Sequence, residues 1–226
     1  MHSESQISDL ANRTNHLSYD ELVDMLRCAR RTFTRDWAIL AVGYWHGLRN
    51  QEIAKLRLND IDWSSQTITV CRLKSSLRTT QPIVKAKGKP ELCEWTAIKT
   101  WLRERKSPSD YFFTSKRDDS CIGEKQMNRI FKKYLQMASA ERIARGSKAI
   151  ANYARGDKNS RIGWKACSLS LHSLKHTRGS LAAIAGTNPL DIKMILGHKS
   201  LSSTERYVHP KQVEAWKRNL RLELYA

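Results

Sequence analysis

The stretch Leu196-Gly197-His198-Lys199-Ser200-Leu201-Ser202-Ser203-Thr204-Glu205-Arg206-Tyr207 places a tyrosine nine residues after a Gly-His pair, in a basic segment rich in hydroxyl side chains. The pair follows an apolar run that predicts a short helix over 189–196, ended by Gly197. A histidine that binds phosphate beside a nucleophilic tyrosine would show this spacing. Two structural explanations stay open from this stretch alone: His198 as a helix C-cap, and Tyr207 as a packed core residue.

A tyrosine nucleophile needs cations around the phosphate that it attacks. A free phenol has a pKa near ~10 and is a poor nucleophile at neutral pH. Cations favour the phenolate and stabilise the charge of the transition state, and arginine does so with a planar fork that holds two phosphate oxygens. The leaving oxygen needs a proton from a general acid on the opposite side. Such a site needs no metal in principle.

The composition favours a polyanionic partner. The 226 residues include 40 Lys or Arg and 22 Asp or Glu, a net charge of +18, and neutralising phosphates with such charge releases counterions. The alternative is a basic protein with no nucleic-acid role. The five cysteines have no C-x-x-C spacing, so neither a zinc site nor a disulfide framework is predicted. No apolar run reaches the ~20 residues of a membrane span. We expect a cytoplasmic, nucleoid-associated bacterial protein without cofactors.

Hydrophobic periodicity predicts a mainly α-helical fold with one small antiparallel β-sheet, an α+β class. A capping box at Ser18-Tyr19-Asp20-Glu21 opens the first helix. Further helices are predicted over 37–45, 90–106, 125–137, 173–185, 189–196 and 211–224. Residues 66–72 alternate and are rich in Thr, Ile and Val, so they predict a strand, with 79–84 as its hairpin partner.

Three segments differ from this predicted body. Residues 1–17 indicate a flexible polar lead-in. Residues 141–166 hold seven Lys or Arg with fading periodicity, which indicates a basic insertion that either contacts DNA or is a solvated loop. The helix within 211–226 has an apolar stripe that needs a partner, either within the chain or in trans. The predicted domain therefore spans 18–226.

Four motifs, in order along the chain, resemble those of the tyrosine recombinases of the phage integrase family. Gly47-Leu48-Arg49-Asn50-Gln51-Glu52 is similar to the first arginine box of the family, and Arg72-Leu73-Lys74 lies where the family keeps its hairpin lysine. His172-Ser173-Leu174-Lys175-His176-Thr177 resembles the His-x-x-Arg-His-Thr box. Leu196-Gly197-His198 with Tyr207 resembles the last histidine and the nucleophile. The resemblance covers about residues 17–210.

The resemblance implies a site-specific recombinase that cleaves and rejoins DNA through a 3′-phosphotyrosine, without metal or ATP. It gives each motif residue a role in that reaction. Arg49 would clamp the scissile phosphate, Lys74 would protonate the leaving 5′ hydroxyl, His172 and His198 would assist proton transfer, Glu52 would brace the site, and Tyr207 would attack. The reaction would carry out integration, excision or inversion.

The sequence departs from the family pattern in two places. Lys175 stands where the family has its second arginine, and a lysine is a point charge rather than a fork. Arg178 lies three residues on, on nearly the same helical face, and is a candidate to compensate. Most members also carry an N-terminal domain, whereas about 17 residues precede the first predicted helix here. The chain is then either a fragment or a short member, as the fimbrial invertases are.

The implied partner is double-stranded DNA with a specific recombination site, bound by a tetramer that forms from monomers on DNA. Two alternatives stay open: a DNA-binding relative with reduced catalysis that acts as a regulator, and a type IB topoisomerase-like activity. The cations expected to contact DNA are Arg72, Arg78, Arg155, Lys158, Arg161, Lys165, Lys199 and Arg206.

Overall fold

The computed structural model describes residues 16–73, 78–115, 117–146 and 169–207 of the chain. The predicted C-terminal helix and residues 147–166 of the predicted basic insertion lie outside these ranges. So do five of the predicted site residues, which are Lys74, Arg155, Lys158, Arg161 and Lys165.

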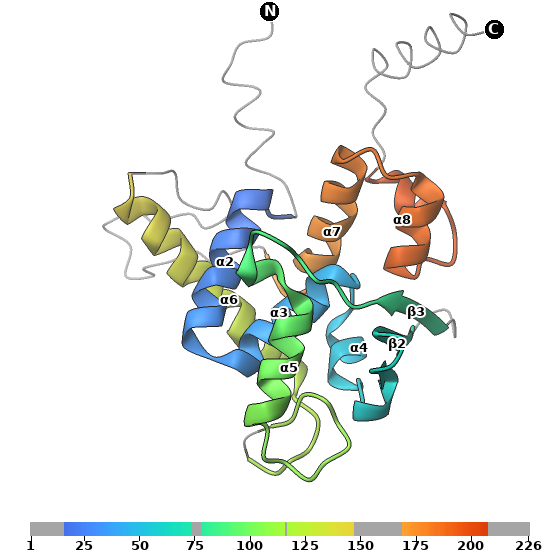
Figure 1. Ribbon diagram of the computed structural model, residues 1–226. Coiled ribbons are helices and arrows are strands. Elements are labelled where there is room, and N and C mark those ends of the chain that lie inside the picture. Colours follow the sequence, from blue (N-terminus) through green and yellow to red (C-terminus); the bar gives the residue numbers. More distant parts are fainter. Residues whose placement is uncertain (1–15, 74–77, 116, 147–168, 208–226) are drawn as a thin grey trace, which may run out of the picture.

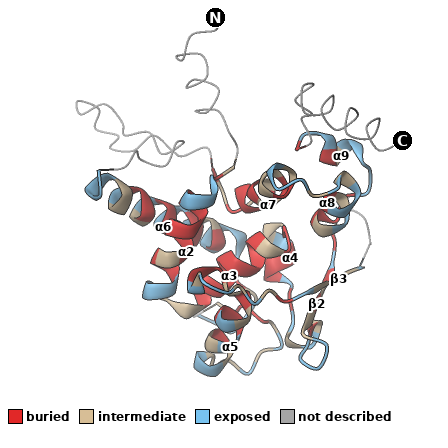
Figure 2. Ribbon diagram, turned by 45° about the horizontal axis from the view of Figure 1, so that its top comes forward, coloured by how far each residue is buried: buried red, intermediate tan, exposed pale blue. Residues whose placement is uncertain are grey.

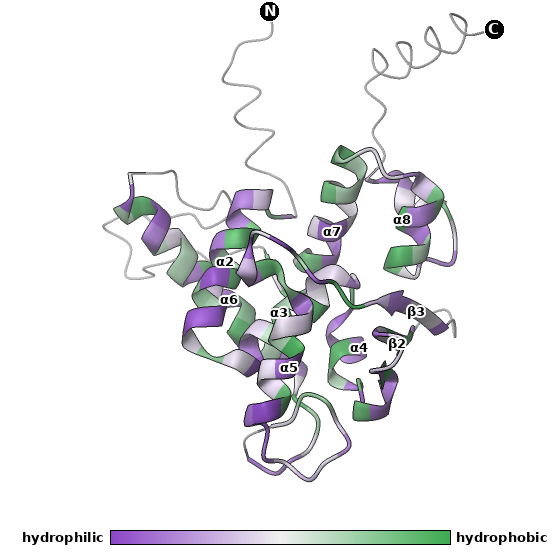
Figure 3. Ribbon diagram, viewed as in Figure 1, coloured by the Kyte–Doolittle hydropathy of each residue, from purple (hydrophilic) through white to green (hydrophobic). Residues whose placement is uncertain are grey.

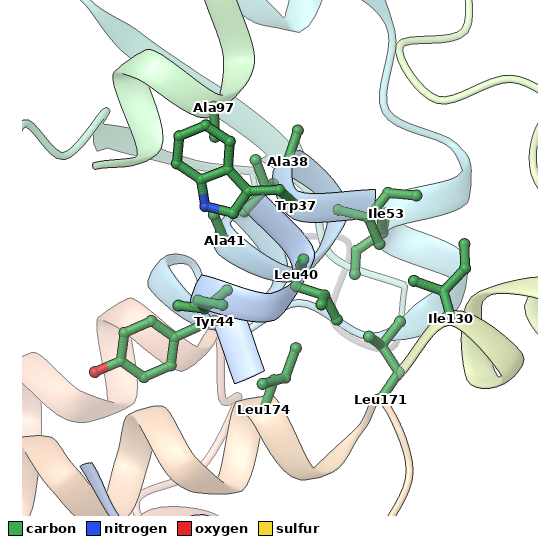
Figure 4. Close-up of a cluster of buried hydrophobic side chains, with 14 of the residues drawn as sticks. Trp37, Ala38, Leu40, Ala41, Tyr44, Ile53, Ala97, Ile130, Leu171 and Leu174 are labelled. Atoms are coloured by element: carbon green, nitrogen blue, oxygen red, sulfur yellow. The ribbon is translucent and has the colours of Figure 1, made fainter. Parts of the chain in front are cut away.

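Helix α3 (Thr34–Trp45) forms the centre of the larger part of the molecule. It packs against α2 (Tyr19–Thr32) and α5 (Glu94–Glu104). Its residues 35–44 are all buried, which is typical of a helix that is apolar on most sides. Figure 4 shows α3 side chains clustered with apolar residues from elsewhere in the chain, among them Ile53, Ala97, Ile130, Leu171 and Leu174.

The first helix begins where its sequence signal predicts. The Ser18 hydroxyl accepts from the Glu21 backbone N–H, and the Glu21 carboxylate accepts from the Ser18 N–H. This capping box satisfies two of the N–H groups that a helix start leaves without partners. Helix α2 packs against α3 and α6 (Glu124–Ala144) with its buried residues. Its exposed residues meet solvent (Figure 2).

The predicted hairpin is confirmed. Strand β2 (Thr67–Cys71) pairs antiparallel with β3 (Arg78–Pro82), in a register that sets Thr69 opposite Thr80. A two-residue strand β1 (Ile61–Asp62) adds to the other edge of β2, giving the order β1-β2-β3. Two short 3-10 turns, Leu58–Asp60 and Pro90–Leu92, lead into β1 and α5.

Three helices near the end of the described chain form a smaller part of the molecule. They are α7 (Ser173–Ile184), α8 (Pro189–Leu196) and α9 (Ser202–Glu205), drawn in orange in Figure 1. Ala182, Ile192, Leu196 and Tyr207 form a second buried apolar cluster here, separate from the main one, and the apolar positions of α7 and α8 stand out in Figure 3. Tyr207 thus sits on a small local core.

The structure corrects two predicted boundaries. Helix α6 continues to Ala144, so the predicted insertion does not begin at 141. Ion pairs hold this last turn, since Arg31 binds Glu141 and Arg142 binds Asp24. Leu17, predicted in the loose lead-in, is fully buried, and its N–H donates to the Thr177 hydroxyl at 2.9 Å.

Within the described ranges, every helix is too short or too polar to cross a membrane.

Candidate active site

Arg49 and Glu52 form one unit at the start of α4 (Asn50–Ala54). Gly47, with φ of 55°, ends the turn after α3, and Arg49 is the N-cap of α4. The Glu52 carboxylate accepts from the Arg49 N–H and from Nη1 of its guanidinium, both at 2.9 Å. Glu52 is completely buried, while the Arg49 side chain is a quarter exposed at 25%. The carboxylate therefore fixes Arg49 with part of its guanidinium open to a ligand.

Glu52 is a buried carboxylate that lies among three cations, Arg49, Arg72 and Lys175. Burial alone would raise the pKa of Glu52, but the Arg49 N–H and the charges of Arg72 and Lys175 bring it below its usual value. The carboxylate therefore stays ionised at neutral pH. Its oxygens accept hydrogen bonds from Arg49 and Arg72 and so hold both guanidinium groups in place.

Arg72 holds neighbouring elements together through buried hydrogen bonds, which corrects its predicted contact with DNA. Its side chain is fully buried. The guanidinium donates to the carbonyls of His46 and Ile195, each at 2.9 Å, and to Glu52 at 3.3 Å. Its Nε donates to the Thr79 hydroxyl at 2.9 Å. The side chain of Arg72, the residue that follows β2, thus joins the end of α3 to α4, β3 and α8, the elements that surround the site.

Lys175 occupies the second arginine position as a buried cation. It is 2% exposed, and its Nζ donates to the carbonyl of Leu196, just before Gly197-His198. Burial, together with the charges of Arg49 and Arg72, lowers the pKa of Lys175 to about 7. The buried ammonium therefore loses its proton far more easily than an ordinary lysine, and more easily than an arginine would at this position.

Arg178 does not take the place of the missing arginine in this structure, which corrects the compensating role considered for it. Its guanidinium lies 5.1 Å over the ring of Trp45 and 5.9 Å from that of Tyr44. Cation–π contacts of this kind hold it against α3. Arg178 therefore packs against aromatic rings of α3, whereas the Nζ of Lys175 binds the Leu196 carbonyl.

Three histidines surround Tyr207. His198 stacks on its ring, with 6.2 Å between centroids, and the Nδ1 of His198 pairs with the Thr204 hydroxyl at 3.0 Å. His176 Nδ1 lies 2.9 Å from the Tyr207 hydroxyl, and His172 lies edge-on to His176 at 4.9 Å. The sequence prediction missed His176 and Thr204. The i, i+4 spacing of His172 and His176 was the available signal for the former.

Burial and positive charge set the ionisation of this group. Burial, with the charges of Lys175 and Arg49, lowers the pKa of His198 to about 4. The same causes lower the pKa of His172. Burial raises the pKa of Tyr207, while the charges of Arg206 and Arg49 oppose the rise. Because Arg49 acts on all three groups, the first arginine box, both family histidines and the tyrosine lie in one electrostatic environment.

The remaining predicted DNA contacts divide into two groups. Arg78, Lys199 and Arg206 are exposed, on β3 and on the segment from His198 to Tyr207, so they stay available to a polyanion. Lys74 and the four cations of the predicted insertion lie outside the described residues. Among the residues that the structure describes, no three His, Cys, Asp or Glu side chains group in a way that would hold a metal ion.

Gly197 should be sensitive to substitution because both its backbone and its surroundings exclude a side chain. Its φ is 61°, and an added Cβ would lie 2.6 Å from Arg72 Nε. We expect Gly197→Ala to lower the free energy of unfolding by about 2–4 kcal/mol in urea titrations. Gly186→Ala is the matched control, since its φ of 80° carries the backbone strain while nothing lies within 4 Å. Equal losses in the two variants would contradict a role for the Arg72 contact.

The sequence matches the model of the phage integrase family over residues 15–214. Because this match covers most of the chain, the protein belongs to the phage integrase family.

Curated relatives include both short and longer members. The type 1 fimbriae regulatory protein FimE of Escherichia coli (strain K12) is 24% identical over 213 residues, which are 92% of this chain and 93% of FimE. FimB of the same strain is 30% identical over 111 residues, 46% of this chain and 52% of FimB. The tyrosine recombinase XerC of Thermodesulfovibrio yellowstonii is 30% identical over 182 residues, 79% of this chain and 51% of XerC. The matched part therefore spans about half of FimB and XerC, but nearly all of FimE.

Solved structures show the same fold. The crystal structure of XerA recombinase superposes with a TM-score of 0.63 at 22% identity, covering 91% of this chain and 64% of XerA. The catalytic core of lambda integrase gives 0.56 at 12% identity, covering 81% of this chain and 91% of that core. The mainly helical fold with a small antiparallel sheet is thus that of a tyrosine recombinase catalytic domain.

Proposed function

We propose that this protein is a site-specific recombinase that cleaves and rejoins DNA, with Tyr207 forming a 3′-phosphotyrosine bond. The observation that carries the proposal is the arrangement of histidines around Tyr207 beside a partly exposed Arg49. His198 stacks on the tyrosine ring and His176 is hydrogen-bonded to its hydroxyl. The charge of Arg49 acts on Tyr207, His172 and His198 at once. A phosphate among these cations would lower the pKa of the phenol further and stabilise the transition state. Family membership supports this chemistry.

Each residue then has a role that its surroundings support. Arg49, held by Glu52 and partly exposed, clamps the non-bridging oxygens. Lys175 adds a second cation, and bound phosphate favours its charged form. His172 and His198 hold oxygens or relay protons, and Lys74 protonates the leaving 5′ oxygen. The phosphotyrosine conserves the energy of the phosphodiester, so rejoining needs no ATP.

The proposed partner is double-stranded DNA with a specific site, bound by a tetramer that assembles on it. The net charge of +18 supports a polyanion partner, and the fold relative XerH is described as bound to its difH substrate. Arg78, Lys199 and Arg206 are the exposed candidates for contacts to the DNA backbone. The helix that the sequence predicts over 211–224, with its apolar stripe, is the candidate contact between protomers. A place on the bacterial nucleoid would follow from this DNA binding.

A covalent adduct tests the reaction directly. The half-site is first found by selecting bound duplexes from a random pool, and a copy nicked close to the cleavage point then traps the intermediate. We expect a protein–DNA adduct that survives denaturing gels with the unaltered chain and is absent with Tyr207→Phe, because phenylalanine has no nucleophile. Tyr44→Phe serves as the matched control, since that tyrosine lies on α3 and should leave the adduct in place.

The same assay separates the alternatives. Tight binding without an adduct would favour a regulator with reduced catalysis, for which the buried Lys175, bound to the Leu196 carbonyl and with a lowered pKa, is the supporting observation. Relaxation of supercoiled plasmid without a preferred site would favour a type IB topoisomerase-like activity.

A further inference from the structure

The Tyr207 hydroxyl has a partner that the family resemblance does not assign. Its oxygen lies 2.9 Å from Nδ1 of His176, and the two rings are tilted at 47° with 5.9 Å between centroids. His198, on the other side, stacks on the tyrosine ring, and its Nδ1 is paired with Thr204. Of the histidines around the site, His176 is therefore the one hydrogen-bonded to the reacting atom among the described residues.

The surrounding backbone holds this contact in place. The Tyr207 N–H donates to the Thr204 carbonyl at 2.9 Å. The tyrosine ring lies over Gly179 of α7, where an added Cβ would be 3.0 Å from its Cδ1 and Cδ2. His176 is on the same helix, one turn earlier. Because the Tyr207 ring packs on α7 and His176 belongs to α7, this helix sets the position of the ring relative to the imidazole.

The imidazole of His176 is available as a proton acceptor. Burial is the first cause that lowers its pKa, to about 4, and the groups that face it are His172, Arg206, Lys175 and His16, each of which lowers it further. The ring is therefore neutral at physiological pH. Tyr207, whose pKa is raised by burial, carries its proton there. The site thus pairs a protonated phenol with a neutral imidazole.

We propose that His176 is a catalytic residue whose Nδ1 takes the hydroxyl proton of Tyr207 as the phenolic oxygen attacks the phosphate. This inference rests on the proposed recombinase function. The bond from phosphorus to the Tyr207 oxygen forms while the bond to the 5′ oxygen breaks. The phenol proton moves to His176 Nδ1, and the leaving oxygen receives a separate proton from the general acid on the opposite side. Rejoining reverses both transfers, so His176 returns its proton to Tyr207.

Bound phosphate would assist this transfer. Burial is the largest cause of the low pKa of His176, and the charges of Arg206 and Lys175 add to it. The phosphate of the DNA would partly neutralise those charges. Their effect on His176 then weakens, and its basicity rises towards the usual value for histidine. Bound phosphate therefore offsets the part of the pKa shift that the neighbouring charges cause.

Adduct formation by His176→Asn and His176→Ala is the central test. Asparagine can place an oxygen near the Nδ1 position, so it accepts a hydrogen bond but not a proton. We expect both variants to form adduct about 10²–10⁴-fold more slowly than the unaltered chain at pH 7. Ser180→Ala, on the same helix, is the control and should keep the normal rate. Normal DNA binding and circular dichroism would establish that the variants fold.

Two further measurements test whether the His176 variants are slow because Tyr207 is not deprotonated. In the His176 variants, the rate should rise about tenfold per pH unit between pH 7 and 9, because hydroxide replaces the missing base, whereas the unaltered chain should change little. A substrate with sulfur at the bridging 5′ position needs no proton on its leaving group. It should rescue Lys74→Ala but not His176→Ala.

The outcomes separate this inference from the function on which it depends. No adduct with the unaltered chain would defeat the proposed function. An adduct with the unaltered chain and an equal rate for His176→Asn would overturn the catalytic role and leave His176 as a positioning residue. Rescue of His176→Ala by the sulfur substrate would also overturn it, because the defect would then lie at the leaving group.

Discussion

Replacing Arg72 with methionine is expected to lower the free energy of unfolding by about 3–5 kcal/mol, the typical cost of removing one partner from a buried ion pair. The guanidinium is fully buried against the Glu52 carboxylate. Its loss would also leave the carbonyl of His46 without this donor. Chemical denaturation at pH 7, followed by circular dichroism, measures the change.

Arg78→Met is the matched control for this prediction, because it alters the other arginine of the hairpin at an exposed position. We expect less than about 0.5 kcal/mol of destabilisation from it, with weaker DNA binding and a shallower salt dependence. Arg72→Met should instead lose stability while its DNA binding and the salt dependence of that binding stay normal. If Arg72→Met kept normal stability and lost only DNA affinity, Arg72 would be a DNA contact after all.

Replacing Lys175 with methionine should change how stability depends on pH. The pKa of Lys175 is about 7 in the folded protein against 10.5 for an ordinary lysine. Between these values the unfolded chain holds a proton that the folded protein has released, so stability rises with pH. Below pH 7 both states are protonated and the penalty of the buried charge is complete. Lys175 therefore destabilises the fold most in acid and least above pH 10.

The methionine variant lacks this titration. Its stability relative to the unaltered chain should be greatest near pH 6 and should fall by roughly 4–5 kcal/mol over the whole window up to pH 10.5. Denaturant titrations at several pH values measure the difference, with Lys193→Met on the partly exposed face of α8 as control. A constant difference across the window would mean that Lys175 stays charged. Adduct formation should drop about 10²–10³-fold if Lys175 stabilises the transition state.

The elements that the sequence predicted well are those whose signals lie within a few residues. The capping box at Ser18 and the glycine after Leu196 depend on neighbouring backbone groups, and both helix ends lie where these signals predict. The hairpin follows from alternation in one short segment. Helix α6 was predicted too short, because its last turn depends on Arg31 and Asp24, which lie far away in the sequence.

The predictions for the candidate site divide in the same way, into motif residues that could be identified and tertiary partners that could not. Arg49, His172, Lys175, His198 and Tyr207 could be selected because each belongs to a recognisable local motif. The partners of the cations could not be predicted. Arg72 and Arg178 both looked like ligands for phosphate, yet one is bound by carbonyls and Glu52 and the other by two aromatic rings.

By itself, the sequence determined the order of the motifs, the helix ends marked by Ser18 and Gly197, and the hairpin of β2 and β3, since hydrogen bonds between near neighbours and apolar spacing set these features. Only the tertiary structure decided which charged side chains remain available to bind phosphate. Arg72 reaches the Ile195 carbonyl across 123 residues, and His176 reaches the Tyr207 hydroxyl across 31. A side chain's burial and its hydrogen-bond partners depend on segments that meet only in the folded protein, and these two properties decide whether a cation binds phosphate and which histidine meets the tyrosine.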